Sequence, residues 1–223
     1  MKGVLDYTYA RQREKKSGIR YRLIRRTHEI LQAIAKYRPD PKSVLDLGTA
    51  EGRMLSAVKC KYPAAFCVGI EYSLDLLQMG ASLHPNLKFI RADAQRLQFL
   101  KHGSFDVAIA AAIIEHLHEP RTMIRESYRL LKPGGIMIIT TPHPFWERIA
   151  NGLGMIKGEH QFTMGLRSIQ GLCQGECFAI LEKKGFMISP IGFPGEVKIE
   201  RVLQGIDLDK NLPNQLVVAR KPI

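Results

Sequence analysis

Residues 44–53 read Val-Leu-Asp-Leu-Gly-Thr-Ala-Glu-Gly-Arg. A β-rich apolar run delivers Asp46, then Gly48 turns the chain and Gly52 opens a stretch with helical spacing. Because glycine has no Cβ, a ligand can lie against bare backbone beside the N-terminus of the helix. The stretch therefore predicts a nucleotide-type binding turn after the first strand of an α/β sheet.

A second carboxylate supports this interpretation. Glu71 ends the next apolar run, 25 residues after Asp46. A carboxylate at the end of the second strand can accept hydrogen bonds from both hydroxyls of a ribose. The glycine pattern alone is a weak signal, and Glu71 strengthens it.

Around this turn, short apolar runs alternate with helical stretches, which is typical of a parallel sheet flanked by helices. We expect strands at 43–47, 66–71, 87–91, 105–110 and 136–141, and helices at 53–61, 73–82 and 120–131. Later segments predict a loop or lid with a short helix over 145–166, a helix over 166–184, and strands near 186–191 and 215–220. The fold class is α/β, with a Rossmann-like, doubly wound, mostly parallel seven-stranded sheet over 43–223.

Composition agrees with a folded α/β protein. The 223 residues are 45% hydrophobic and 24% charged, which excludes a wholly disordered chain. No apolar run reaches the roughly 20 residues of a membrane-spanning helix, and the first residues have no apolar core of a secretory signal. We expect a cytoplasmic protein. Four cysteines do not make a disulfide framework, and no metal site is expected.

The charge is uneven along the chain. Residues 1–42 form a basic N-terminal arm with 12 Lys and Arg against four acidic residues, so they carry +8 of the net +12. Such an arm fits an anionic partner: a lipid surface, a phosphorylated substrate or RNA. It equally fits a solvated helical extension that docks on the domain through an apolar stripe. That stripe consists of Leu23, Ile24, His28, Ile30, Leu31, Ile34 and Ala35.

Two cofactor classes use a turn of this kind, the dinucleotides and S-adenosylmethionine. A dinucleotide turn needs three glycines, whereas the corresponding positions here are Gly48, Ala50 and Arg53. Glu51 adds a negative charge that repels a diphosphate at close range. S-adenosylmethionine has no phosphate and carries a sulfonium and an ammonium, so nearby carboxylates favour it.

The sequence resembles the class I S-adenosylmethionine-dependent methyltransferases, specifically the small-molecule "methyltransferase domain" group. Asp46-Leu-Gly48-x-x-x-Gly52 matches the family's first motif, which implies that this stretch, with Thr49 and Ala50, lines the methionine half of the cofactor. Ala50 departs from the family pattern, since many members have glycine there. The resemblance covers residues 43–142 well and the C-terminal third more loosely.

Further motifs follow in the family's order. Val68-Gly-Ile-Glu71-Tyr-Ser implies that Glu71 holds the ribose diol and that Tyr72 lies by the adenine. Arg91-Ala-Asp93-Ala94 implies that Asp93 accepts from the adenine amino group while the Ala94 backbone caps the ring.

The resemblance also covers the fourth strand and the end of the chain. Ser104-Phe-Asp106-Val followed by Ala110 resembles the fourth strand, whose end contacts the methionine ammonium. From the residues alone, Asp106 more readily reads as a hydrogen-bonding strand start. Glu115-His116-Leu and Leu130-Leu-Lys-Pro133-Gly134-Gly135 complete the order, and the family fold implies that the last two strands form an antiparallel hairpin.

Methyl transfer from a sulfonium is an in-line displacement in which positioning carries most of the rate. A general base is needed only where the acceptor loses a proton. Loops at the carboxyl ends of the strands offer the candidates. His116 is the first choice, followed by Glu115 and His160, with His143 behind them; a helix-start histidine packed against the cofactor is the alternative for His116.

The sequence gives less information about the methyl acceptor. Ala110-Ala-Ala-Ile stands where amino-group methyltransferases of bases have an Asn/Asp-Pro-Pro-Tyr/Phe motif. The apolar residues of 145–166 line an acceptor pocket or pack in the core; they are Phe145, Trp146, Met155, Phe162 and Met164. We expect a small-molecule or lipid-like acceptor. The alternatives are an RNA methyltransferase that uses the basic arm, a non-catalytic cofactor-binding module and, disfavoured by Glu51 and Arg53, a dinucleotide-dependent oxidoreductase.

Overall fold

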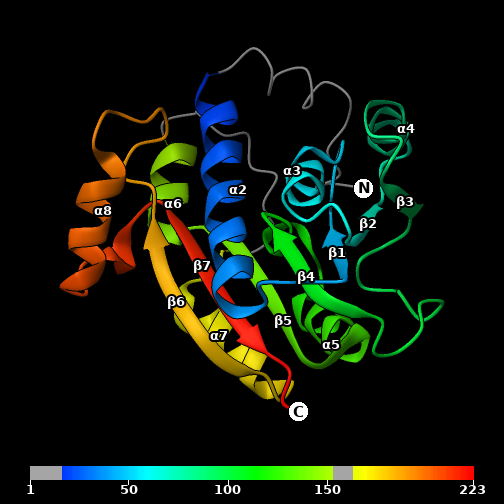
Figure 1. Cartoon of the computed structure of the whole chain (residues 1–223). Coiled ribbons are helices and arrows are strands. Elements are labelled where there is room, and N and C mark those ends of the chain that lie inside the picture. Colours follow the sequence, from blue (N-terminus) through cyan, green and yellow to red (C-terminus); the bar gives the residue numbers. More distant parts are fainter. Residues whose placement is uncertain (1–16, 153–162) are drawn as a thin grey trace.

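A single seven-stranded sheet runs through the computed structural model of the chain (Figure 1), which describes residues 17–152 and 163–223. The strand order is β3-β2-β1-β4-β5-β7-β6. Strands β1 to β5 pair in parallel, and β7 runs antiparallel to both of its neighbours, β5 and β6. The expected fold class is confirmed, including the antiparallel hairpin of the last two strands.

The bounds of the elements place both ends of the sheet. The strands are β1 Ser43–Leu47, β2 Phe66–Glu71, β3 Lys88–Arg91, β4 Phe105–Ala111, β5 Leu131–Pro142, β6 Ala179–Phe186 and β7 Asn214–Arg220. The helices are α2 Ser17–Tyr37, α3 Arg53–Lys61, α4 Leu74–Leu83, α5 Pro120–Leu130, α6 Pro144–Gly152, α7 Leu166–Gly175 and α8 Glu196–Gly205, with short 3₁₀ turns η1 Ile114–His116 and η2 Asp209–Asn211. Within the described ranges, no helix is long and apolar enough to cross a bilayer.

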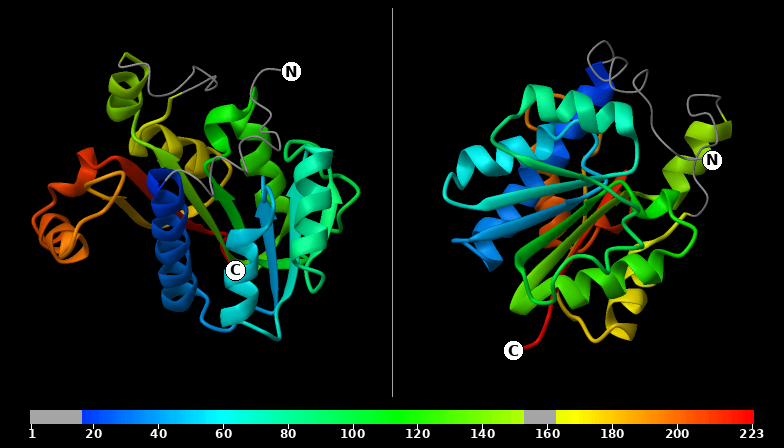
Figure 2. Two further views of the ribbon diagram at one scale, coloured as in Figure 1. Left: turned by 90° about the horizontal axis from the view of Figure 1, so that it is seen from above. Right: turned by 90° about the vertical axis from the view of Figure 1, so that its right-hand side faces the viewer.

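Helices cover both faces of the sheet (Figure 2), which explains why the central strands are apolar without alternation. Successive residues of β1 point to opposite faces: Val44 packs with α2 and α3, whereas Leu45 packs with α5 and α7. Val107 and Ala108 in β4 divide in the same way. The sheet therefore separates two hydrophobic cores. A shift of one residue in a strand would turn its side chains to the opposite faces, so these cores fix the register of the strand ends that form the site.

Helix α2 docks on the sheet through part of its expected apolar stripe, since Leu23, Ile30, Leu31 and Ile34 pack in the core. Ile30 and Ile34 are fully buried, but Ile24 is 58% exposed. The other buried positions of α2 are Ala33 and two charged residues, Arg25 and Glu29. Hydrophobic patterning counts only apolar residues, so it does not reveal the charged residues that share the buried face.

The ion pairs that hold α2 reach two distant elements. Arg25 contacts Glu200 of α8, and its Nη2 lies 3.4 Å from Glu29 Oε1. Lys184 of β6 places its Nζ 3.0 Å from Glu29 Oε2 and 2.9 Å from Glu182 Oε1. Buried charges are stable only when paired in this way, so the network fixes the rotation of α2 about its axis.

Two expectations for the C-terminal half are wrong. The helix predicted over 166–184 ends at Gly175, and the strand predicted near 186–191 lies instead at Ala179–Phe186. Strand β6 lies at the edge of the sheet, where charged side chains are common. In the sequence, these charged residues resemble the exposed face of a helix, which explains the wrong prediction. The short helix expected within 145–166 is α6, residues 153–162 of that segment lie outside the described residues, and α8 was not expected.

At the amino end of β4, opposite the binding turn, Asp106 is almost fully buried and joins three segments. Its Oδ1 accepts from Arg38 Nη2 at 2.6 Å, and its Oδ2 accepts from the Ser43 backbone N–H at 2.9 Å and from Lys132 Nζ at 3.1 Å. Burial opposes ionisation, but the hydrogen bonds from Arg38 and Lys132 outweigh it and lower the pKa of Asp106 to about 2. Asp106 therefore has the strand-start role read from the residues alone.

We predict that Asp106→Asn lowers the free energy of unfolding at pH 7 by about 2 kcal/mol, because a folded-state pKa below the usual value of about 3.9 is a stabilisation of that size. The contribution is complete above the unfolded pKa and disappears as the pH falls toward 2. Urea unfolding at pH 7 and pH 3 checks both points. Asp40→Asn is the control, since exposed Asp40 pairs with Lys42 on the surface. An equal loss of stability in both variants would contradict the assignment.

Candidate functional site

The turn after β1 has an unusual backbone. Gly48, Ala50 and Gly52 all have positive φ, at 70°, 50° and 78°. A Cβ at Gly48 would lie 2.6 Å from Ile113 Cδ1, so glycine is required there for space as well as for conformation. Ala50 adopts the left-handed conformation without that freedom, at a cost of order 1 kcal/mol or more. Something must hold it there.

The Glu71 carboxylate holds it. Glu71 ends β2, and its Oε2 accepts from the Ala50 backbone N–H at 2.8 Å while its Oε1 accepts from the Ser73 N–H at 2.8 Å. Burial raises the pKa of Glu71, against the lowering effect of these backbone donors. Each carboxylate oxygen keeps a second lone pair. Glu71 can therefore hold the turn and still accept hydrogen bonds from a ribose.

Asp46, next to last in β1, lies beside this carboxylate. Its side chain is 2% exposed and accepts a hydrogen bond from Thr49 Oγ1 at 2.7 Å. Burial raises the pKa of Asp46 to about 7; the Thr49 hydroxyl lowers it and the charge of Glu71 raises it. A buried site with two such acids favours a cationic ligand. Glu51, which is 1% exposed at the same turn, opposes a diphosphate.

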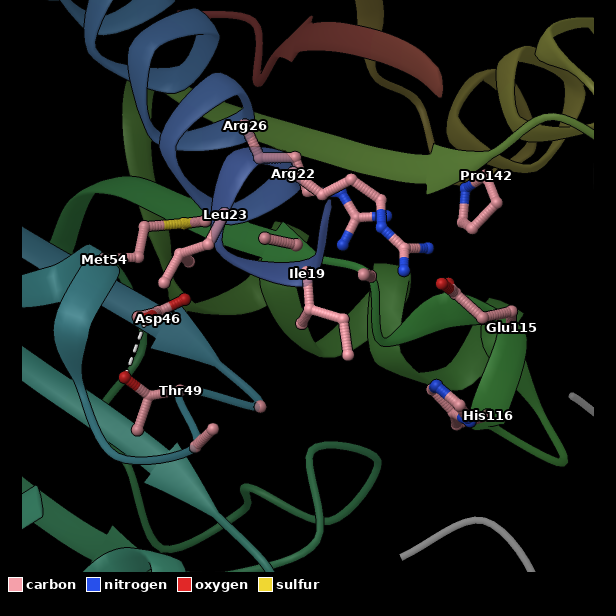
Figure 3. A pocket seen from close by; sticks show the side chains of 14 residues that line it. Ile19, Arg22, Leu23, Arg26, Asp46, Thr49, Met54, Glu115, His116 and Pro142 are labelled. Carbon is pink, nitrogen blue, oxygen red and sulfur yellow. Dashed lines mark hydrogen bonds between the residues drawn. The ribbon is translucent and has the colours of Figure 1, made fainter. Parts of the chain in front are cut away.

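A cavity of about 120 Å³ opens beside the turn (Figure 3). Its walls come from the β1 turn, the ends of β4 and β5, η1 and α2. The lining residues are Ile19, Arg22, Leu23, Arg26, Asp46, Gly48, Thr49, Ala50, Met54, Ala111, Ala112, Glu115, His116 and Pro142. Six of the expected site residues are thus brought together: Asp46, Gly48, Thr49, Ala50, Glu115 and His116.

The residues expected around the adenine lie outside this cavity. Tyr72, 41% exposed, and Asp93 follow β2 and β3. Asp93 Oδ1 accepts from the Gln95 N–H at 2.8 Å, and Ala94 is buried. Ala110 is also fully buried, within the core. The backbone after it, Ala111 and Ala112, lines the cavity instead.

The candidate catalytic residues stand on the far side of the cavity from the turn. Glu115 is 2% exposed, and its Oε2 accepts from Thr141 Oγ1 at 3.1 Å. His116 follows it in η1. His160 lies outside the described residues. His143 follows β5, where its Nδ1 accepts from the Phe145 N–H at 3.2 Å and burial lowers its pKa.

The expected apolar set does not form one lining. Phe145 and Trp146 are exposed and meet edge to face on α6, with their ring centroids 5.5 Å apart. Met164 packs against the core. Met155 and Phe162 lie outside the described residues. Among the residues that the structure describes, no cluster of three potential metal ligands occurs.

Sequence reasoning missed the contribution of α2. Ile19, Arg22, Leu23 and Arg26 line the cavity opposite the turn, although they precede β1 in the chain. The only signal was the spacing of four between Arg22 and Arg26, which places both on one helix face. Which face meets the sheet depends on the ion pairs of Arg25 and Glu29, and these are visible only in three dimensions.

Comparison with known proteins agrees with the geometry. Residues 45–139 match the family described as "Methyltransferase domain". This part of the chain, less than half of its length, is similar to a methyltransferase domain, and the seven-stranded fold agrees with that similarity. S-adenosylmethionine is the cofactor that this similarity supports, and the carboxylates of the turn fit the positive charges of that molecule.

Two curated relatives and one solved structure show the range of this similarity. The chain is 26% identical over 141 residues to a malonyl-[acyl-carrier protein] O-methyltransferase of Halalkalibacterium halodurans, covering 58% of this chain and 52% of the relative. It is 34% identical over 110 residues to a demethylmenaquinone methyltransferase of Streptomyces avermitilis, covering 49% and 46%. The chain thus spans about half the length of the curated relatives it matches. A putative sarcosine dimethylglycine methyltransferase from Galdieria sulphuraria shares the fold, with a TM-score of 0.70 at 15% identity over 92% of this chain and 88% of that chain.

We predict that Glu71→Ala weakens S-adenosylhomocysteine binding at least tenfold, because a charged bidentate contact contributes about 1.5–3 kcal/mol. Calorimetric titration measures the change, and a thermal melt checks that the turn still folds. Asp75→Ala, an exposed acid on α4, is the matched control. Unchanged affinity in Glu71→Ala would remove this residue from the cofactor site.

We also predict that S-adenosylhomocysteine binds about tenfold more tightly at pH 8 than at pH 6. The ammonium of the ligand favours ionised Asp46, and a carboxyl group with a pKa of about 7 is mostly protonated at the lower pH. Titrations at pH 6, 7 and 8 test this slope. Asp46→Asn should flatten the slope and Asp75→Asn should keep it; a flat profile in the unaltered protein would contradict the prediction.

Proposed function

We propose that the protein transfers a methyl group from S-adenosylmethionine to a small-molecule or lipid-like acceptor at the cavity between the β1 turn and η1. One observation carries this proposal: a single cavity is lined both by the turn expected to hold the methionine half of the cofactor and by Glu115 and His116. Binding at one cavity places a donor and an acceptor side by side, as an in-line displacement requires.

The donor supplies a methyl group on a sulfonium, and the chain supplies position and charge. In this proposal, Asp46 and the backbone of Gly48 to Ala50 orient the methionine end, and Glu71 orients the ribose. Glu115 is held by Thr141 and points into the cavity (Figure 3), so it can accept a proton from an acceptor hydroxyl or orient that group. His116 offers a second proton acceptor on the same turn.

The acceptors named for the two relatives, a malonyl-[acyl-carrier protein] and demethylmenaquinone, differ in chemistry. The class of acceptor must therefore be read from this chain's own cavity.

An RNA acceptor has less support. Several basic side chains of the N-terminal arm are engaged within the protein, since Arg25 and Arg38 form ion pairs with Glu200 and Asp106. Arg22 and Arg26 face the cavity. RNA binding with a steep salt dependence would reverse this preference.

Cofactor binding and turnover can be tested separately. Titration with S-adenosylhomocysteine should show micromolar binding, whereas NADH should not bind. Formation of S-adenosylhomocysteine from S-adenosylmethionine, measured over a panel of carboxylic acids, phenols and quinols, should identify an acceptor class. Tight NADH binding would contradict the proposed cofactor. Cofactor binding without turnover on any acceptor would favour a non-catalytic module.

Once an acceptor is found, we predict that Glu115→Gln lowers kcat by 10²-fold or more if that acceptor is a hydroxyl, because general-base catalysis typically contributes a factor of this size. S-adenosylhomocysteine affinity should change less than twofold. Glu119→Gln, on the exposed loop after η1, is the control and should leave both constants unchanged. A Glu115→Gln variant with full kcat would exclude Glu115 as the base.

A further inference from the structure

Two arginines of α2 reach into the cavity beside the candidate catalytic residues. Arg22 and Arg26 are one helical turn apart and half-buried. In Figure 3 their guanidinium groups extend toward Glu115 and Pro142, whereas Leu23 lies toward Met54 and Asp46. The two positive charges are thus on the η1 and β5 side of the cavity.

Arg26 is positioned by the last strand. Its Nε and Nη2 donate to Asn214 Oδ1 at 3.1 Å and 2.9 Å. Asn214 begins β7 and lies opposite Pro142 of β5 in the sheet register. The anchor therefore ties the guanidinium to the strand end that forms the cavity wall.

Arg22 has no such anchor. Within the described part of the chain, its Nε donates a long hydrogen bond of 3.4 Å to the Gly18 carbonyl, and it pairs with no carboxylate. Three other cations of α2 and the segment after it do have acidic partners: Arg25 pairs with Glu200, Lys36 with Glu182 and Arg38 with Asp106. A half-buried guanidinium without a carboxylate is a strong donor for an anionic ligand, to which it can bind bidentately.

The cavity contains few acidic residues that could neutralise the two arginines. Glu115 and Asp46 are its only acidic lining residues among those described. Glu115 accepts a hydrogen bond from Thr141, and burial raises the pKa of Asp46 to about 7, so Asp46 is only partly ionised at neutral pH. The side of the cavity that holds Arg22 and Arg26 is therefore electropositive, with Glu115 as its nearest acid.

We propose that Arg22, with Arg26 beside it, binds a carboxylate or phosphate group of the methyl acceptor, so that α2 is part of the acceptor site. This inference rests on the proposed function and narrows it to acidic small molecules. The position of the two guanidinium groups by Glu115 and Pro142, away from Asp46 and Thr49, assigns them to the acceptor and not to the cofactor's own carboxylate.

The first arm of the test separates these two carboxylates. S-adenosylhomocysteine carries the methionine carboxylate, whereas 5′-methylthioadenosine lacks it. Calorimetric titration of Arg22→Gln with both ligands should give affinities within about twofold of the unaltered protein. A loss of S-adenosylhomocysteine affinity alone would mean that Arg22 binds the cofactor's carboxylate, and it would overturn the proposal.

The second arm uses simple anions as probes. Malonate, citrate and inorganic phosphate are titrated into the protein saturated with S-adenosylhomocysteine. At least one of them should bind in the millimolar range, and Arg22→Gln should weaken that binding at least tenfold. Arg20→Gln is the matched control, because it removes the same charge from an exposed position of the same helix. Arg26→Gln provides a second variant, and thermal melts confirm that all three variants fold.

The outcomes are distinguishable. Anion binding that Arg22→Gln abolishes and Arg20→Gln retains supports the proposal. Failure of all three probes to bind, or an equal loss in both variants, overturns it while leaving the methyltransferase assignment intact. Failure to bind S-adenosylhomocysteine at all contradicts the proposed function itself.

Discussion

The hydrogen bond from the Ala50 N–H to the Glu71 carboxylate is the contact on which the site depends. It joins the turn after β1 to the end of β2 and holds a non-glycine residue in the left-handed conformation. The same carboxylate accepts from Ser73, so the start of the segment leading into α4 is fixed as well. One buried acid thereby sets the shape of the backbone against which the cofactor is expected to lie, and it remains able to accept from a ribose.

The other wall of the cavity depends on a different kind of contact. Helix α2 packs on the sheet through Ile30 and Ile34, but apolar contacts alone leave its rotation loosely defined. Arg25 and Glu29, paired with Glu200 and Lys184, define the rotation because buried charges tolerate few arrangements. The network lies within about one helical turn of Arg22 and Arg26, which face the cavity. Contacts outside the cavity therefore determine where these two arginines point.

The sequence predicts the cofactor half of the molecule well because its signals are local. The bounds of β1, β2 and α3 agree with expectation, since the strands are apolar runs, Gly52 directly precedes the helix, and the turn is built from adjacent residues. The acceptor half depends on contacts between residues far apart in the chain. Arg26 donates a hydrogen bond to Asn214, and Lys184 of β6 forms an ion pair with Glu29 of α2. Neither local patterns nor the order of motifs predicts contacts between residues so far apart in the chain. The error over residues 166–184 has the same origin, because the lysines and glutamates of β6 resemble a helix surface until their partners are known.

The antiparallel direction of β7 has a consequence for the order in which the protein assembles during synthesis. Because β7 runs against its neighbours, its first residue, Asn214, lies at the same sheet edge as the ends of the parallel strands. The turn and its Glu71 contact need only the first 73 residues, whereas the anchor of Arg26 is made near the end of the described chain. Domains fold as units, and N-terminal segments emerge from the ribosome first. Helix α2 is therefore made early but gains its Asn214 contact only after β7 has been synthesised, so the cavity wall formed by α2 is among the last parts of the sheet's carboxyl end to be completed.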